Sequence, residues 1–456
     1  IISSVDAVAQ NAYYHLAECY LSLNQKSEAL NAFKNASEMS FSAKIKEDAF
    51  LNYAKLSYEQ GNPYKSVALV LQDFLAAYPQ SAYYKEINTL VVTSYIYQQD
   101  YQGALNYLSK NRNLENISLS KDVSFYRGVQ LFNEQKLKQA YPFFNTATGS
   151  NDALIKVSAK YWKAETDYQL GNYKNALEGF SAFKSDIRAS AINEYERIDY
   201  GIAYSYFKLK DYAKAATFFL SFLKGAKGNN PLNDDANIRL GDCYFASKNY
   251  QNAINAYESV LKKKGIGSDY ALYQKGMSFG FIGQNDQKIS NLLAVASQYP
   301  TSNLQDDALF QTASTYTLLK NNTKAHQTYD RLLKEHPKSS YIPSALLRQG
   351  LLYYNDNKPD AALEKYKTIV KDYAATNEAK QAVSNARNVY VDIGQVDAYA
   401  AWVKNLSFVN VTNADLDNTT YEAAENKFLA NNNVKAIVSE YETIKNFERG
   451  FEAHKH

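Results

Sequence analysis

The sequence of 456 residues has only two cysteines, two methionines, two tryptophans and eight prolines, and its 18 glycines are also few for this length. Two cysteines cannot form the disulfide framework that holds small secreted domains together. Because proline and glycine interrupt regular structure, their scarcity disfavours a fold built from many strands and turns. The chain also lacks a run of 18 apolar residues, so we predict no transmembrane segment.

An excess of charge of one sign is missing as well. Lysine and arginine total 50 against 47 acidic residues, which leaves a net charge of +3. A nucleic-acid-binding surface normally needs a clustered basic excess, so we predict no nucleic-acid partner. Phosphate-loop, dinucleotide-binding, zinc-protease and serine-hydrolase motifs are all absent, and the five histidines are scattered. We therefore predict a protein that is not an enzyme, with no catalytic residues, no metal site and no cofactor.

Tyrosine is abundant, at 40 residues, and it belongs to a repeated pattern. The stretch GNYKNALEGF at 171–180 recurs along the chain, for example as KNYQNAINAY at 248–257 and NKPDAALEKY at 357–366. Apolar residues at spacings of three and four predict helices throughout. The small residue of the pattern returns every 35 to 39 residues, at Ala29, Val67, Ala104, Ala140, Ala176, Ala215, Ala253, Lys288, Ala325, Ala362, Tyr399 and Ala436.

In most copies a second small residue lies twelve positions before the first. An aromatic or large apolar residue lies four positions after the first small residue. The twelve-before position holds Ala17, Gly128, Ala164, Ala203, Gly241, Gly276, Ala313 and Gly350. These features resemble the tetratricopeptide repeat, in which two helices approach closely at small residues and an aromatic residue fills the gap to the next unit. The resemblance implies an all-α fold: a right-handed α-solenoid superhelix of about eleven to twelve helix-turn-helix units.

The rhythm of the repeat divides the chain. Residues 1–403 read as the main array, with about eleven units of period about 37. Residues 404–420 are rich in β-branched residues, Asn and Asp, and read as a joint outside the repeat. Residues 421–456 read as the start of a second array, which we expect to be truncated because no polar capping helix follows. A polar loop at 224–234 is a lesser irregularity, expected to bend the superhelix.

Some polar residues invite a chemical interpretation that the repeat makes unnecessary. The pairs Asp234–Asp235 and Asp306–Asp307 both open the first helix of a unit, where carboxylates cap the helix and complement its dipole. A general acid–base pair is the alternative reading. Cys19 and Cys243 occupy the same position of their units, so we predict a structural slot for a small, partly buried residue rather than a reactive thiol.

The first helices of such arrays line the concave face, where partners usually bind. Residues three before, one after and four after the small residue of that helix fall on one stripe. The central units have an aromatic stripe, and tyrosine suits peptide or protein capture. The predicted partner-binding residues are Tyr14, Glu18, Phe125, Phe132, Tyr161, Glu165, Tyr168, Tyr200, Tyr204, Phe207, Asp242, Phe245, Leu351 and Tyr354.

The phrases ALYQKG, GDCYF and TTYEAAE give a narrower resemblance to long exported tetratricopeptide proteins of the Bacteroidota. It implies a periplasmic or outer-membrane-associated location, through an N-terminal anchor outside this sequence; a cytoplasmic location is left open. The function expected is a non-catalytic protein–protein interaction scaffold of the bacterial cell envelope, binding a protein or peptide along its concave face. The alternative is a module that binds peptidoglycan or another glycan on its tyrosine-rich stripe. The sequence does not specify the oligomeric state or the partner.

Overall fold

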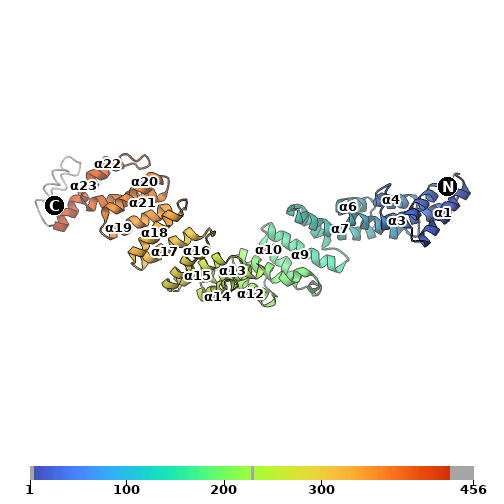
Figure 1. Cartoon of the computed structure of the whole chain (residues 1–456), viewed down its shortest axis with the longest axis horizontal. Helices are drawn as coiled ribbons and strands as arrows, with labels where there is room; N and C mark the ends of the chain where they lie inside the picture. Colours follow the sequence, from blue (N-terminus) through green and yellow to red (C-terminus); the bar gives the residue numbers. More distant parts are fainter. Residues whose placement is uncertain (1–4, 227–230, 432–456) are drawn as a thin grey trace. The chain divides into compact units, whose positions relative to one another are not determined.

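The computed structural model describes residues 5–226 and 231–431. Within these residues every regular element is a helix, as the sequence predicted (Figure 1). The chain divides into two compact units, residues 1–226 and 227–456. The division falls inside the polar loop at 224–234. The separation predicted at residue 403 stays a prediction.

In the described part of the first unit, the α-helices form six consecutive pairs, and we call the members of each pair helix A and helix B. The pairs are α1 (Ala7–Ser22) and α2 (Lys26–Glu38), α3 (Ala43–Gln60) and α4 (Val67–Ala77), α5 (Tyr84–Tyr97) and α6 (Tyr101–Lys110), α7 (Leu114–Asn133) and α8 (Leu137–Ala147), α9 (Ala153–Gln169) and α10 (Tyr173–Lys184), and α11 (Ile198–Lys208) and α12 (Tyr212–Gly225). Two short 3₁₀ helices, η1 (Ile187–Ala191) and η2 (Asn193–Arg197), lie between α10 and α11.

The described part of the second unit continues with five pairs and one further helix. They are α13 (Pro231–Ala246) and α14 (Tyr250–Lys262), α15 (Ser268–Phe281) and α16 (Asn285–Gln298), α17 (Gln305–Leu318) and α18 (Asn322–Glu335), α19 (Ile342–Asn355) and α20 (Pro359–Asp372), α21 (Asn377–Asp392) and α22 (Val396–Val403), and α23 (Asn413–Asn431). Within each unit, each α-helix packs on its neighbours in sequence, which is the arrangement of an α-solenoid.

The turn between helix A and helix B follows one geometry. In every pair except the second, helix B begins three residues before its small residue, and a residue of positive φ lies two residues before the helix begins. Gly171 occupies this position in the fifth pair with φ of 84°, and the N–H of Asn172 then donates to the carbonyl oxygen of Asp167 at 2.8 Å. This left-handed residue ends helix A and satisfies its last carbonyls. Other pairs place Asn, Gln or Lys there, so glycine alone does not mark the turn.

The helix pairs close around small residues and one large ring. A Cβ atom added to Gly241 would lie 2.4 Å from a ring carbon of Tyr257, and one added to Gly350 would lie 2.5 Å from Tyr366. Both rings are completely buried. The ring of helix B therefore lies directly on the small residue of its own helix A, whereas the sequence led us to expect it in the gap to the next unit. Rings also reach the next pair, because Phe144 stacks on Trp162 of α9 at a centroid distance of 6.3 Å.

Three sequence expectations need correction or lie out of reach. Val67 is the first residue of α4, so the small position of the second pair belongs to Val70, which is 1% exposed. Helix α23 begins at Asn413, so residues 413–420 of the expected non-repeat joint are helical. Two hydrogen bonds between Thr412 and Asp415 stabilise its first turn. The expected small residue Ala436 and the rest of 432–456 lie outside the described residues.

Candidate binding surface

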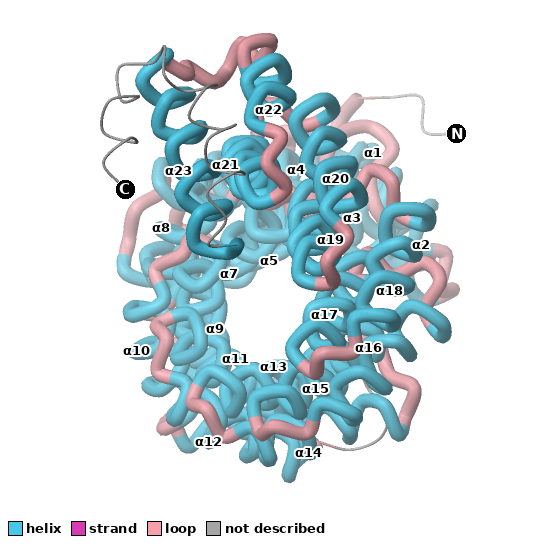
Figure 2. Tube along the Cα trace, turned by 90° about the vertical axis from the view of Figure 1, so that its left-hand side faces the viewer, coloured by secondary structure: helices cyan, strands magenta, loops and turns pink. Residues whose placement is uncertain are grey.

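Within each unit, the helices A lie on one side of the stack and the helices B on the other (Figure 2). In the first unit α7, α9 and α11 follow the inner side and α10 and α12 the outer side; in the second unit α13 and α17 are inner and α14 and α16 outer (Figure 2). We call the helix-A positions three before, one after and four after the small residue the inner wall. All fourteen predicted site residues occupy it by sequence position. Their burial and contacts differ widely, and these decide which of them a partner could touch.

Three predicted residues belong mainly to the core. Tyr161 is 5% exposed and its ring lies against Phe180 and Phe183, with centroid distances of 5.6 and 5.4 Å. Phe125 and Phe132 are half-buried and pack against the buried ring of Phe144. Their rings fill the space between pairs, so these positions offer a partner little free surface.

Two predicted tyrosines use their hydroxyl groups to join neighbouring pairs. The hydroxyl of Tyr14 donates to Asp48 of α3, and the hydroxyl of Tyr354 donates to Asp392 of α21. The hydrogen bond to Asp392, followed by burial, raises the pKa of Tyr354 to about 12. Both bonds span more than thirty residues of sequence. They explain part of the tyrosine content as a structural device that ties one helix A to the next.

Asp242 is also a structural anchor. Its carboxylate accepts hydrogen bonds from the hydroxyls of Tyr257 and Tyr270, at 2.8 and 3.0 Å, and from Arg239 at 2.7 Å. Burial, and then the charge of Asp242, raises the pKa of Tyr270 to about 12. Three donors already surround this carboxylate, so it is poorly placed to receive a partner.

The acidic pairs that open two helices also join pairs. Asp306 accepts the N–H of Asp307 at 3.0 Å with one carboxylate oxygen, within the first turn of α17, and the hydroxyl of Ser339 at 2.6 Å with the other. Asp307 accepts from Tyr341 at 2.5 Å. Both aspartates therefore have structural roles. The sequence predicted helix capping, but not the contacts of Asp306 and Asp307 with Ser339 and Tyr341 of the next pair.

Asp234 repeats this arrangement. It is 6% exposed and accepts the N–H of Ile266 at 3.1 Å, whereas its neighbour Asp235 lies 3.5 Å from the guanidinium of Arg239. The two carboxylates are therefore directed to different partners.

Four predicted residues form a continuous group of half-buried rings, which we call the aromatic ladder: Tyr168, Tyr200, Tyr204 and Phe207. Tyr204 lies at the centre, with ring centroids 6.4 Å from Tyr168, 4.9 Å from Tyr200 and 6.3 Å from Phe207. The ladder crosses from α9 to α11, and Tyr173 and Tyr212 extend it at its ends. Tyr200 and Tyr204 also pack on the buried ring of Phe219, at 6.1 and 5.3 Å. Among the predicted positions, these four form the largest group of rings in contact with one another.

The remaining predicted residues are separate from the ladder. Glu18 accepts from His15 at 2.7 Å, Glu165 accepts from Gln169 at 2.9 Å, and Leu351 is 48% exposed. Phe245 lies against Phe281 at a centroid distance of 5.4 Å. Phe281 is 58% exposed and stacks on Tyr250 at 4.8 Å, yet the stripe rule missed it because it follows its small residue by five positions.

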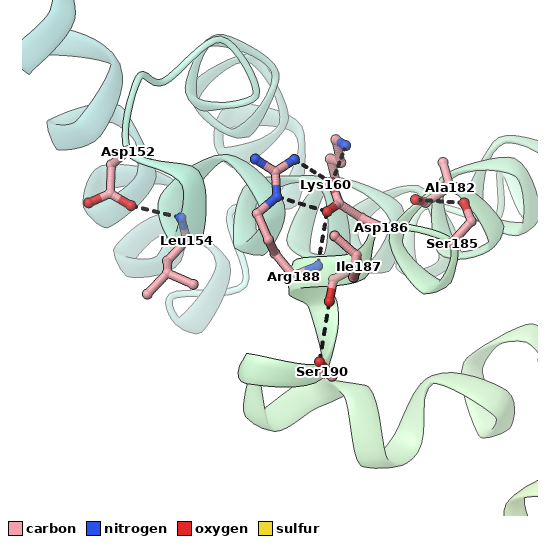
Figure 3. Close-up of polar contacts among 9 residues, drawn as sticks. All are labelled: Asp152, Leu154, Lys160, Ala182, Ser185, Asp186, Ile187, Arg188 and Ser190. Atoms are coloured by element: carbon pink, nitrogen blue, oxygen red, sulfur yellow. Dashed lines mark hydrogen bonds and ion pairs between the residues drawn. The ribbon is translucent and has the colours of Figure 1, made fainter.

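The insertion between α10 and α11 is a second feature missed from sequence. Asp186 holds it: its carboxylate accepts from Lys160 at 3.0 Å and from Arg188 at 2.9 and 3.0 Å (Figure 3). The hydrogen bonds from Arg188, and then from Lys160, hold the pKa of Asp186 well below its usual range. Ile187 beside it is 90% exposed. The one sequence signal was the wide spacing of 39 residues between Ala176 and Ala215.

Cavities are found elsewhere on the pairs. One of about 480 Å³ is lined by Tyr14, Asp48 and Tyr83 among others, and one of about 700 Å³ includes the ion pair of Lys275 and Glu258. A third, of about 720 Å³, lies beside α21 and α23. Of the fourteen predicted residues, only Tyr14 lines any of these three cavities.

The two cysteines differ although they share a repeat position. Cys243 is completely buried, and burial raises its pKa to about 12, whereas Cys19 is exposed. The expectation of a partly buried slot is therefore wrong for Cys19.

We expect the native protein to react with one equivalent of a thiol reagent such as DTNB at pH 8. Cys19 is exposed, while Cys243 is buried and remains protonated at that pH. The second equivalent should react only after unfolding in guanidinium chloride. A Cys19→Ser variant should show no fast reaction, and a fast second equivalent in the native protein would contradict this assignment.

Residues 5–226 and 231–431 contain no group of three or more His, Cys, Asp or Glu arranged to hold a metal ion. No described helix is long and apolar enough to cross a membrane.

Comparison with known proteins finds tetratricopeptide-repeat models in five segments of the chain. Tetratricopeptide-repeat models match residues 10–42, 200–269, 270–302, 307–339 and 344–376. A search of curated proteins gives no match. Similar solved structures include the C-terminal part of a tetratricopeptide protein from Cytophaga hutchinsonii, with 15% identity, 61% of this chain and 98% of that chain covered, and a TM-score of 0.43.

A tetratricopeptide protein from Parabacteroides merdae is also similar, with 14% identity, 59% and 98% coverage and a TM-score of 0.38. MamA from Desulfovibrio magneticus has 17% identity, 41% and 98% coverage and a TM-score of 0.34. These scores are low, so the assignment rests on the repeat models together with the paired helices. On that basis residues 10–42, 200–302, 307–339 and 344–376 are tetratricopeptide repeats, and the chain is a protein that contains this repeat.

Proposed function

We propose that this chain is a non-catalytic scaffold that binds a protein or peptide partner along its inner wall, chiefly at the aromatic ladder. Solenoid repeats generally present extended concave binding surfaces, so an interaction role is the general expectation for the family. The ladder is the observation that carries the more specific proposal. Its rings are half-buried, in contact with one another and on neighbouring inner helices.

The ladder suits a polypeptide for a physical reason. Each tyrosine ring is fixed in orientation by its neighbours, so little side-chain entropy remains to be lost on binding. An aromatic ring also offers a large apolar contact area to a partner. We further propose a location in the bacterial cell envelope. The support for this location is the resemblance of three short sequence phrases to exported proteins of the Bacteroidota.

The proposal is tested by capture from the envelope fraction of cells that make this protein. A partner retained by the wild-type chain should bind at least about tenfold more weakly to Tyr168→Ala/Tyr204→Ala, because interface tyrosines commonly contribute 1–2 kcal/mol each or more. Tyr64→Ala is the matched control, since Tyr64 is 60% exposed in the turn before α4. Circular dichroism and thermal melting of each variant separate a binding loss from a folding loss.

Two outcomes would count against the proposal. If no envelope protein depends on the ladder, the scaffold role at this surface fails. If the wild-type chain instead binds peptidoglycan fragments on a glycan array and the double variant does not, the ladder serves as a stacking platform for sugars.

A further inference from the structure

An exposed arginine lies over the inner wall of the second unit. Arg348 of α19 lies two residues before the small residue Gly350, and its side chain reaches α17 of the preceding pair. The Cζ atom of its guanidinium lies 5.0 Å from the ring centroid of Phe310, and one guanidinium nitrogen donates to the hydroxyl of Ser314 at 3.2 Å. Phe310 and Ser314 occupy inner-wall positions of α17, three before and one after Ala313.

These contacts hold the guanidinium in one place. Phe310 is 7% exposed and also stacks on Tyr341 at a centroid distance of 4.6 Å, so its ring is a firm base. The hydroxyl of Ser314 donates in turn to the carbonyl oxygen of Phe310 at 2.8 Å. A guanidinium has five N–H donors in a fixed planar arrangement, and the contact with Ser314 leaves most of them for another acceptor.

Arg348 differs from the other arginines in the described part of its unit. Within residues 231–431, Arg239, Arg331 and Arg387 lie 2.7, 2.9 and 2.8 Å from a carboxylate oxygen. Arg348 has no such ion pair with any residue of this range, although its side chain is exposed. Its positive charge is therefore held in position without a carboxylate to neutralise it.

An exposed leucine lies beside this charge on the same helix. Leu351 is 48% exposed and follows Arg348 by three residues, so the Cβ atoms of the two lie about 5–6 Å apart on the helix surface. Side chains two residues apart in an extended peptide are separated by about 6.6 Å and point to the same side. An extended segment can therefore place one side chain at Arg348 and the next-but-one at Leu351.

We propose that Arg348 and Leu351 bind an acidic segment of a partner protein, in which an Asp or Glu lies two residues from an apolar residue. The carboxylate accepts hydrogen bonds from the guanidinium, and the apolar side chain packs on Leu351. Because Phe310 and Ser314 already order the guanidinium, the pairing loses less side-chain entropy than it does at a mobile surface arginine. This site goes beyond the function proposed for the aromatic ladder, since it belongs to the other unit and recognises charge.

Other anionic partners fit this site less well. Membrane surfaces and nucleic-acid backbones are bound by several basic side chains together, and phosphate groups on peptides are commonly held by clusters of arginines. Here a single arginine stands beside an apolar side chain. One carboxylate with an apolar neighbour matches that combination.

The full chain is tested by selection from a library of random peptides displayed as N-terminal fusions, so that every carboxylate comes from a side chain. We expect the wild-type chain to enrich sequences with Asp or Glu two positions from Leu, Ile, Met or Phe. An enriched peptide, synthesised with an acetylated and an amidated end, should bind Arg348→Gln at least about tenfold more weakly in calorimetric titration, because hydrogen bonds to charged groups are strong. Arg348→Lys keeps a charge but loses the planar fork, so we expect intermediate binding.

Two further variants test which side chains form the site. Arg331→Gln is the matched control, because the Arg331 side chain is 38% exposed on α18 and pairs with Glu335; its binding should equal that of the wild type. Leu351→Ser should still select acidic peptides but lose the preference for an apolar residue. Thermal melting of each variant separates a binding loss from a folding loss.

Four results would overturn the proposal. They are a wild-type selection without acidic sequences, equal binding by Arg348→Gln and the wild type, an equal loss in Arg331→Gln, and a dimer of the chain that Arg348→Gln abolishes, which would assign the site to a second copy. The variant Tyr168→Ala/Tyr204→Ala should bind the selected peptide as the wild type does. Failure at the ladder and failure at Arg348 are therefore distinguishable.

Discussion

Replacing Tyr257 with alanine is expected to lower the free energy of unfolding of the second unit by about 3–5 kcal/mol. The ring is completely buried among Ile238, Ala253 and Ala271 and lies on Gly241. Its removal leaves a cavity over Gly241, which has no side chain to fill the space. Denaturation in urea, followed by circular dichroism, measures the loss.

The loss of stability has one contribution from the ring of Tyr257 and another from its hydroxyl. Tyr257→Phe keeps the ring and removes only the hydroxyl that donates to Asp242 at 2.8 Å. Because Asp242 keeps its hydrogen bonds from Tyr270 and Arg239, we expect this variant to lose only about 1–2 kcal/mol. Equal losses for the two variants would contradict the view that the ring, rather than its hydroxyl, carries most of the stabilisation.

Replacing Gly350 with alanine is expected to destabilise the second unit by about 1–3 kcal/mol, although alanine favours helices by about 1 kcal/mol over glycine. The added methyl carbon would lie 2.5 Å from the ring of Tyr366, well inside contact distance. That ring is completely buried and cannot move without displacing α20 or α21. Urea denaturation of the variant and the wild type measures the difference.

The control for this prediction is Gly225→Ala. Gly225 ends α12, and an added Cβ atom would meet nothing within 4 Å, so this change should be neutral or stabilising by up to about 1 kcal/mol. A double variant with Tyr366→Leu should cost less than the sum of its two single changes, because the smaller side chain makes room for the methyl group. An unaltered stability in Gly350→Ala would show that the close approach at this position is not needed.

The repeat was readable from sequence because its determinants are local and recur. A small residue such as Gly350, a left-handed turn residue such as Asn357 and a ring such as Tyr366 lie within sixteen residues of one another. Each copy supplies the same steric requirement, so a degenerate copy is recognised from its neighbours. Val67 shows the limit: the longer turn before α4 shifted the pattern by three residues, and spacing alone could not detect the shift.

The sequence predicted which residues share a helix face, but not which of them are buried. Helical spacing placed Tyr161 and Tyr168 on the same wall, about two turns apart. Burial then separated them, because Tyr161 meets Phe180 and Phe183 whereas Tyr168 meets Tyr204 near the surface. Such contacts depend on which side chain of another pair arrives at the same place, and local periodicity carries no information about that.

The stack of helix pairs could be inferred from the residues alone, because the close approach of two helices requires small residues at regular positions. The roles of the additional tyrosines became visible only in the folded chain. Tyr14 and Tyr354 tie pairs together through aspartates more than thirty residues away, while Tyr168 and Tyr204 form part of the ladder. The fold also leaves Cys19 exposed and Cys243 buried at the same repeat position. The reason is physical: whether a helix face is covered depends on the neighbouring helix, which the residues of that face do not specify.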